Sequence, residues 1–173
     1  MIANKVPAII YDAGAVHTSL GSYCGDFGFV ADPDKAGHKE ILDAMSAATE
    51  AVVREFSKEC SIDYTKYLYT FRVAIAAGIP NDGFVELIHA VASACQERGI
   101  NLKPAWGAHI TLSRFKAAKP AEELGDFFKL FQNTPLLGKS RPIAVRVGYA
   151  NWSQPDEEQE LCGHFTTYER FPL

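Results

Sequence analysis

The chain has 173 residues and a net charge of −4 at pH 7, with 47% of its residues hydrophobic and 22% charged. This length and balance predict one globular domain, and they argue against a protein that coats long duplex nucleic acid. No stretch approaches the roughly 18 apolar residues of a membrane helix, and the N-terminal segment lacks the apolar run of a secretory signal, so we expect a cytoplasmic protein with no membrane partner.

The first third of the chain predicts two strands and a helix. Strand-like patterns cover residues 6–11 and 16–23. A helix is predicted to begin at Asp32-Pro33, where an N-cap residue precedes a first-turn proline. Its apolar residues recur three and four positions apart, which predicts a buried face made of Ile41, Met45, Val52 and Phe56.

The rest of the chain interleaves strands and helices. Strand patterns cover 66–77, 108–115, 142–149 and 161–171. A second helix is predicted from about 82 to 98 with Gly99 as its stop, and a third from near Pro120 to before Pro135. These two helices are expected to bury Phe84, Ile88, Val91, Cys95, Leu124, Phe127, Phe128 and Phe131. Because no phosphate-binding glycine loop joins a strand to a helix, we predict a single α+β domain with antiparallel pairing.

Acidic residues are missing from two long windows of the sequence. No Asp or Glu lies between positions 97 and 122 or from 127 to 155. The basic residues of these windows are Arg98, Lys103, Arg114, Lys116, Lys119, Lys129, Lys139, Arg141 and Arg146. A solvated charged face is one interpretation, and binding of a small anion is the other.

The four cysteines stand far apart, at positions 24, 60, 95 and 162. They form no C-x-x-C pair and have no histidine at a metal-ligand spacing. We interpret them as reduced packing residues, and we expect neither a metal site nor a cofactor.

The segment GAHITLSRF, residues 107–115, holds an H-x-T pattern inside a predicted strand. Since side chains two positions apart in a strand share a face, His109 and Thr111 would lie together while Ile110 and Leu112 face the core. An imidazole can give or take a proton near neutral pH, and a hydroxyl beside it can donate a hydrogen bond to a phosphoryl oxygen. The pattern therefore indicates one half of a site for phosphate chemistry.

Two other segments could supply the partner histidine. In AVHTSLGSY, His17 and Ser19 would share a face by the same parity, and the distance to His109 leaves room for a helix–strand–helix excursion, as in a duplicated half-domain. In GHFTTYERF, His164 and Thr166 form a third instance, nearer in sequence to His109. Parity and symmetry favour His17, with His164 as the alternative.

AHITLSRF resembles the second motif of the two-histidine (2H) phosphoesterases, the LigT-like superfamily that includes RNA 2′,3′-cyclic phosphodiesterases and 2′,5′-oligoadenylate-cleaving enzymes. FTTYERFPL resembles the closing strand of that family. The resemblance implies two pseudo-symmetric lobes of antiparallel sheet, with outer helices, around a central cleft. It implies His17 and His109 as catalytic residues, and Ser19, Thr111 and Arg114 as substrate phosphate-binding residues. Simple alternation would put Arg114 on the face of the strand opposite to that of His109, unless the strand ends or bulges there.

The implied activity is a metal-independent phosphodiesterase, a monomer acting on a small nucleotide or a short RNA end. One histidine takes a proton from water or a ribose 2′-hydroxyl, and the other protonates the leaving ribose oxygen. Opening of a 2′,3′-cyclic phosphate is the first expectation, and base stacking would fall to Trp106, Tyr23 or Trp152.

Three alternatives to this activity stay open. The first is hydrolysis of 2′,5′-linked or cyclic oligonucleotides by the same pair of histidines. The second is a non-catalytic module of the same fold that binds a nucleotide or an RNA end. The third is a Ser/His/Asp hydrolase, although the chain has no G-x-S-x-G segment.

Overall fold

The structure, a computed structural model, describes most of the chain. The described residues are 8–10, 17–28, 30–70, 73–105, 107–115, 138–151 and 164–173, together with 122, 125 and 129, and for 8–10, 113–115, 151 and 164 the backbone alone is described. The elements are β1 (Ala8–Ile10), β2 (Gly21–Tyr23), α1 (Ala36–Glu55), β3 (Ile62–Tyr69), β4 (Val73–Pro80), α2 (Asp82–Gln96), β5 (Leu102–Pro104), β6 (Ala108–Phe115), β7 (Gly138–Ser140), β8 (Ala144–Asn151) and β9 (His164–Pro172).

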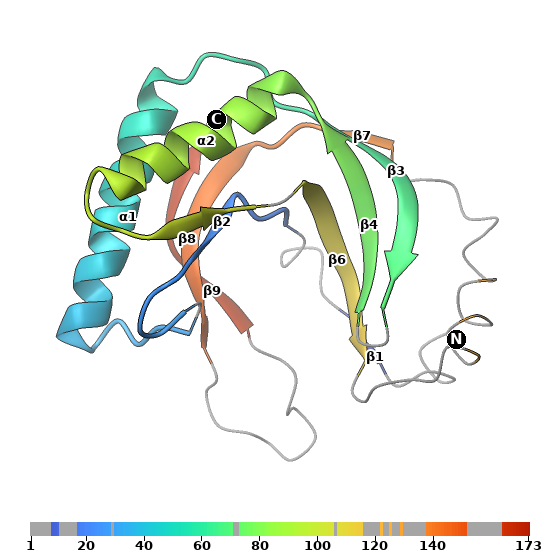
Figure 1. Cartoon of the computed structure of the whole chain (residues 1–173), viewed down its shortest axis with the longest axis horizontal. Helices are drawn as coiled ribbons and strands as arrows, with labels where there is room; N and C mark the ends of the chain where they lie inside the picture. Colours follow the sequence, from blue (N-terminus) through green and yellow to red (C-terminus); the bar gives the residue numbers. More distant parts are fainter. Residues whose placement is uncertain are drawn as a thin grey trace.

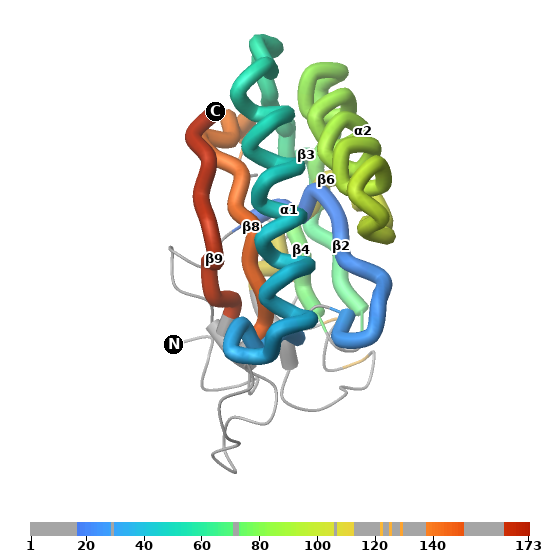
Figure 2. The backbone as a smooth tube through the Cα atoms, turned by 90° about the vertical axis from the view of Figure 1, so that its left-hand side faces the viewer, coloured from blue at the N-terminus to red at the C-terminus, as the bar shows by residue number. Residues whose placement is uncertain are grey.

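The strands form three antiparallel sheets. The largest has five strands in the order β1-β6-β4-β3-β7, and β2–β5 and β8–β9 are two-stranded. Figure 1 shows the large sheet on one side of the molecule and β8–β9 on the other, with α1 packed along β8–β9. In the turned view of Figure 2, α1 and α2 run side by side in front of the strands. The predicted α+β class with antiparallel pairing is confirmed.

Helix α2 agrees closely with its prediction. The Asn81 side chain caps its start by accepting a hydrogen bond from the Phe84 backbone N–H at 3.0 Å, and Gly99 follows its end at a φ of +75°. The four predicted core residues Phe84, Ile88, Val91 and Cys95 are all buried. They pack against the face of the large sheet that carries Ile62, Tyr64, Ala76, Ala108 and Ile110.

The strand predicted over 66–77 is wrong, because this region folds into a hairpin of β3 and β4. The chain turns after Thr70, whose backbone N–H donates to the Val73 carbonyl at 2.8 Å and whose hydroxyl accepts from the Val73 N–H at 3.2 Å. Thr70 thus closes the turn with its own side chain, which a threonine can do in place of glycine or proline.

Helix α1 begins later than predicted, and its most buried side chains differ from the predicted ones, although Met45, Val52 and Phe56 do pack against the core. Asp32 accepts a hydrogen bond from the Asp34 N–H in a turn, and the helix starts at Ala36. Its buried residues are Leu42, Ser46, Ala48 and Thr49, whereas the predicted Ile41, Met45, Val52 and Phe56 are half-buried. The stripe is shifted because α1 packs against both α2 and the β8–β9 sheet.

The predicted third helix, with its core residues Leu124, Phe127, Phe128 and Phe131, lies outside the described residues. Among the helices that are described, none combines the length and hydropathy needed to cross a membrane.

Candidate functional site

The first motif, His17-Thr18-Ser19, lies in an irregular segment that leads into β2. Only Gly21–Tyr23 pair as a strand, so the strand predicted over 16–23 is wrong for residues 17–20, and strand parity does not orient their side chains. The Thr18 hydroxyl shares a hydrogen bond of 3.0 Å with the hydroxyl of Tyr64, which is 3% exposed on β3. This bond attaches the motif to the large sheet in place of strand pairing.

A cavity of about 520 Å³ opens beside this segment, a size at which small-molecule pockets are common. His17, Thr18 and Ser19 line it from one side. Other walls come from the core face of the large sheet, from α2 and from β8–β9, and they include Tyr64, Ile110, Phe84, Gly148 and Phe165. With Met45 and Thr49 of α1 also in its wall, the cavity lies where the first motif, the large sheet, the β8–β9 sheet and both described helices meet.

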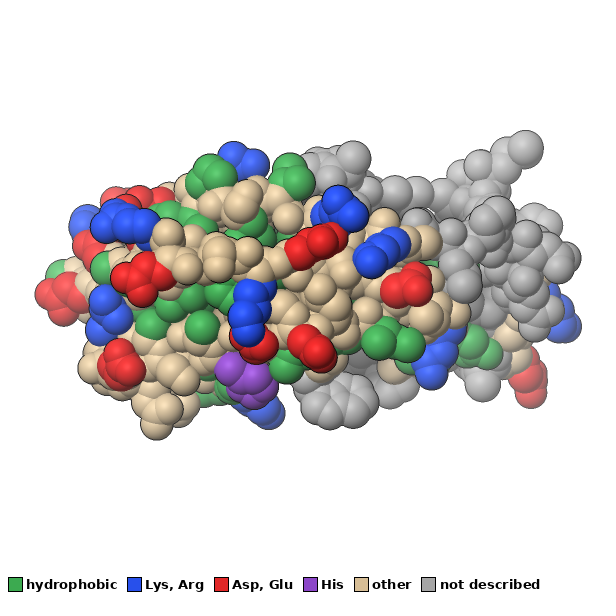
Figure 3. All heavy atoms as spheres, turned by 90° about the horizontal axis from the view of Figure 1, so that it is seen from above, with side chains coloured by type: hydrophobic (Ala, Val, Ile, Leu, Met, Phe, Trp, Pro, Cys, Tyr) green, Lys and Arg blue, Asp and Glu red, His purple; other side chains and the backbone are tan. Residues whose placement is uncertain are grey.

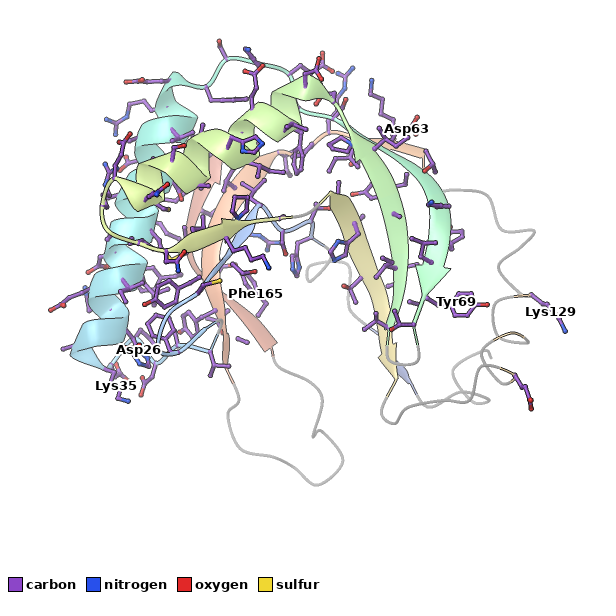
Figure 4. The ribbon with its side chains drawn as sticks, viewed as in Figure 1. Asp26, Lys35, Asp63, Tyr69, Lys129 and Phe165 are labelled. Atoms are coloured by element: carbon purple, nitrogen blue, oxygen red, sulfur yellow. The ribbon has the colours of Figure 1, made fainter. Side chains whose placement is uncertain are left out.

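Phe165 of β9 packs directly on His17. The ring centroids are 5.3 Å apart and the rings are inclined by 25°, a stacked arrangement. The Phe165 ring also covers Gly148, because a Cβ on that glycine would come within 2.5 Å of the ring and 2.4 Å of the Thr166 carbonyl oxygen. Figure 4 shows Phe165 on the side of β9 that faces the middle of the molecule. Gly148 leaves the space that lets Phe165 support the imidazole.

The charged side chains of the described cavity wall are cationic. Arg141, Arg146 and Arg170 line it, and none of its described lining residues is Asp or Glu. By contrast, the face shown in Figure 3 intersperses acidic with basic side chains. Arg141 is exposed and pairs with Glu59 at 3.1 Å. Two of the three arginines come from the acid-free window 127–155, and their position favours the anion-binding interpretation of that window.

The second motif lies on β6, whose bounds match the predicted strand. Ala108 and Ile110 are buried in the core, and Ile110 also contributes to the cavity wall. His109 and Thr111 alternate with them and are half-buried on the opposite face of β6. Among the described lining residues, β6 is represented by Ile110, so the pairing of His109 with His17 across one phosphate stays a prediction.

A β-bulge in β6 changes the position expected for Arg114. Thr111 opposes Ile75 of β4 and Arg114 opposes Val73, which leaves Leu112 as an extra residue on β6. Since residues directly opposite share a face and Val73 and Ile75 are two apart, the register position of Arg114 is on the face of Thr111. Simple alternation would have separated them. The side chain of Arg114 is not among those that the structure describes.

The rival histidine, His164, begins β9 with its backbone opposite Asn151. Its neighbour Phe165 lines the cavity, so alternation puts the register position of His164 on the other face of the strand. Of the three motif histidines, His17 is the one found in the described cavity wall.

Of the aromatic residues predicted to stack on a base, Tyr23 is the one that the structure describes, and it is not among the described lining residues of the cavity. Tyr23 is half-buried and packs on Phe27, with ring centroids 4.7 Å apart, and Trp106 and Trp152 lie outside the described residues. Sequence reasoning missed Phe165 and Tyr64. A signal for Phe165 existed, since it is the middle residue of the third H-x-T pattern.

The cavity wall also contains Cys95, whose thiol pKa is raised by burial. A raised pKa keeps the thiol protonated, so Cys95 is suited to packing rather than to nucleophilic attack. Within the described part of the chain, no three His, Cys, Asp or Glu side chains are grouped so that they could hold a metal ion.

No protein-family model matches the sequence, and no curated protein matches it. Among solved structures, the chain is similar to the crystal structure of the MHV ns2 PDE domain, at 15% sequence identity and a TM-score of 0.42, over 79% of this chain and 76% of that chain. A similarity at this level assigns no residue a role.

Proposed function

We propose that the protein is a metal-independent phosphodiesterase that acts on a short nucleotide or an RNA end and opens a 2′,3′-cyclic phosphate. The observation that supports it is the cavity, where His17, the neighbouring hydroxyl residues Thr18 and Ser19, and three arginines line one space without an acidic side chain among the described lining residues. Imidazole supplies proton transfer, and hydroxyl and guanidinium donors bind phosphate oxygens.

In the proposed reaction His17 and His109 are the acid–base pair. One takes the proton from water, and the other gives a proton to the departing ribose oxygen, so that a phosphomonoester and a ribose hydroxyl are produced. Ser19 and Thr111 hold the non-bridging oxygens, and Arg114 stabilises the charge that develops on them. This reaction requires the face of β6 that carries His109 and Thr111 to reach the same phosphate as His17.

The second candidate function is a non-catalytic module that binds a nucleotide or an RNA end. One observation favours it: β6 contributes Ile110 to the cavity wall, while His109 alternates with it on the opposite face. A cavity with one histidine and several cations can bind a phosphate without cleaving it.

The test incubates the protein, with EDTA present, with 2′,3′-cyclic nucleotides and with 2′,5′-linked oligoadenylate, and separates the products by chromatography. We expect EDTA-resistant opening of the cyclic phosphate. His17→Ala and His109→Ala should lose it, while His89→Ala, exposed on α2 and outside the described cavity wall, should keep it. Each variant is checked for an unchanged circular-dichroism spectrum.

The other outcomes separate the alternatives. Loss of all turnover in EDTA contradicts the metal-independent mechanism. Cleavage of oligoadenylate alone moves the substrate to 2′,5′-linked chains. If nothing is cleaved, but a cyclic nucleotide binds and His17→Ala abolishes that binding, the protein is a non-catalytic module that binds nucleotides.

A further inference from the structure

A row of three residues crosses the large sheet on the face that carries the second motif. His109 of β6 is directly opposite Ala77 of β4, and Ala77 is directly opposite Lys66 of β3. The three strands lie side by side in this order (Figure 1). Because directly opposite residues share a face, His109 and Lys66 are on one surface of the sheet, with a small alanine between them.

Lys66 is on this face because β3 contains a bulge. The register shifts between Tyr64 and Lys66, which leaves Thr65 as an extra residue on β3. Without the bulge, Lys66 would share the face of Tyr64, which is buried in the core. The next residue, Tyr67, packs against that core, so Lys66 belongs to the opposite face, and its side chain is exposed.

The bulge in β6 has the same result for another basic residue. It moves the register position of Arg114 from the core-facing series to the face of Thr111. Each bulge interrupts the pairing of the strands, and bulges are frequent beside active sites, where they re-aim a side chain. Two separate bulges in one sheet therefore bring two cationic positions to the face of His109.

Lys66 is the nearer of these two positions in the direction across the strands. Two strand spacings, about 9.6 Å, separate its backbone from that of His109. The lysine ammonium group, on its flexible four-carbon stem, and the imidazole each extend from their own strand over part of this distance. Ala77 is half-buried and adds one methyl group between them, which leaves space for a small anion that both side chains can contact.

One acidic residue shares this face, and another lysine opposes it. Asp63 of β3 is opposite Ile79, two positions after Ala77, and on its other side it is directly opposite Lys139 of β7. Opposite charges in directly opposed positions stabilise a sheet, so Lys139 balances the charge of Asp63. Within the part of the chain that the structure describes, Lys66 itself forms no ion pair.

We propose that Lys66 binds the phosphate that His109 and Thr111 contact. Its ammonium group is a compact positive charge that binds a non-bridging phosphate oxygen and stabilises the negative charge that develops there, while the imidazole transfers the proton. The role in turnover rests on the proposed function, whereas the binding of a phosphate at Lys66 and His109 does not require turnover.

The first experiment titrates the protein with inorganic phosphate at fixed pH and ionic strength, and follows the imidazole signal of His109 by NMR. The signal is assigned by its loss in His109→Ala. We expect a saturable shift in wild type, and a Kd raised about tenfold in Lys66→Gln, the scale of one hydrogen bond to a charged group. Lys66→Arg keeps the positive charge and should retain most of the affinity.

The matched control is Lys103→Gln, which removes the same charge from another exposed strand lysine, on β5. It should bind phosphate like wild type. An unchanged Kd in Lys66→Gln overturns the proposal, and so does a His109 signal that does not respond to phosphate. Equal weakening in the two glutamine variants overturns it too, because net charge alone would then explain the effect.

The second experiment measures kcat/KM for a 2′,3′-cyclic nucleotide in the same variants. We expect Lys66→Gln to lower kcat/KM about tenfold, and Lys66→Arg and Lys103→Gln to stay near wild type. If Lys66→Gln cleaves the substrate like wild type, the role of Lys66 is wrong and the phosphodiesterase stands. If wild type cleaves nothing, the proposed function fails, and the phosphate titration still decides whether Lys66 and His109 share an anion site.

Discussion

The two H-x-[S/T] segments have the same sequence pattern, but one forms a paired strand and the other is irregular. The second lies on β6, paired with strands on both sides, with His109 and Thr111 on one face. The first lies in an irregular segment that is attached by the Thr18–Tyr64 hydrogen bond and the His17–Phe165 stack. The segment without strand geometry is the one whose histidine is found in the described cavity wall.

This difference shows what a short motif specifies. Strand alternation decides which residues share a face, and it held for His109 and Thr111. It does not decide which face meets the cavity, because that depends on the partner elements. Among the described side chains of β6, the one that reaches the cavity is Ile110, which belongs to the core.

The largest effect should come from the two histidines. Replacing each of them tests directly whether the two segments, despite their different structures, contribute to one site. We expect His17→Ala and His109→Ala each to lower kcat by about 10²–10⁴, the usual contribution of one general acid or base. The measurement is the rate of cyclic phosphate opening, with His89→Ala as control. Wild-type activity in His109→Ala would leave the first segment as the whole site, and wild-type activity in His17→Ala would transfer the role to His164.

The second prediction concerns the support of His17 through Gly148. Gly148→Ala places a Cβ within 2.4 Å of the Thr166 carbonyl oxygen and 2.5 Å of the Phe165 ring, so the β9 backbone and the ring that stacks on the imidazole must both shift. Overpacking of this kind costs about 1–3 kcal/mol, and we expect a lower free energy of unfolding together with a reduced kcat.

The matched control for Gly148 is Gly37, which lies in α1, where an added Cβ would have nothing within 4 Å of it. Gly37→Ala should be neutral, or stabilising by about 0.5–1 kcal/mol, because alanine favours the helix. Urea unfolding measures both changes. Equal stability and equal kcat in the two alanine variants would show that Phe165 does not hold the imidazole.

The third prediction tests whether the hydroxyl pair holds the first segment. Thr18→Val removes the bond to the buried Tyr64 hydroxyl and should lower the free energy of unfolding by about 1–3 kcal/mol, the cost of leaving a buried polar group unpaired. Thr18→Ser keeps the hydroxyl and should keep most of the stability and activity. If the valine and serine variants behave alike, the bond does not position the segment.

The sequence correctly predicts the elements whose ends are marked by residues within or next to the element itself. Helix α2 has its cap at Asn81 and its stop at Gly99, and β6 alternates apolar and polar residues from Ala108 to Ser113, so the pattern places both correctly. The pattern misses the β3–β4 hairpin because its turn uses the Thr70 side chain instead of glycine or proline, and the alternation runs through it. It misses the buried face of α1 because Leu42, Ser46 and Thr49 are covered by elements distant in sequence.

For the candidate site, the sequence predicts residue types but not the contacts between them. The residue types of the first motif and the acid-free window both point to an anion, and His17, Ser19, Arg141 and Arg146 do line one cavity. The stack on Phe165 and the opposition of Arg146 to Arg170 depend on how strands pair, which composition and spacing do not contain.

The smallest effect is expected where β9 meets α1. Tyr168 is the extra residue of a bulge in β9, and its hydroxyl donates a hydrogen bond to Asp43, which also accepts one from Lys39 at 2.6 Å. These bonds, first that from Lys39 and then that from Tyr168, hold the pKa of Asp43 below its ordinary value. A carboxyl with a lowered pKa stabilises the fold above the ordinary pKa of about 3.9, and this contribution is lost as the pH falls through the folded-state pKa.

Comparison of Asp43→Asn with wild type across pH therefore isolates this contact between β9 and α1. The variant should melt slightly below wild type at pH 7, and the two melting temperatures should converge below about pH 4 as the wild-type carboxyl takes up its proton. Glu40→Gln, which removes another exposed carboxyl from the same helix, is the control and should lack this convergence. A difference that persists at low pH would mean that Asp43 acts through packing. Loss of cavity binding in Asp43→Asn would show that this bulge, and not the Phe165 stack alone, sets the position of β9 beside His17.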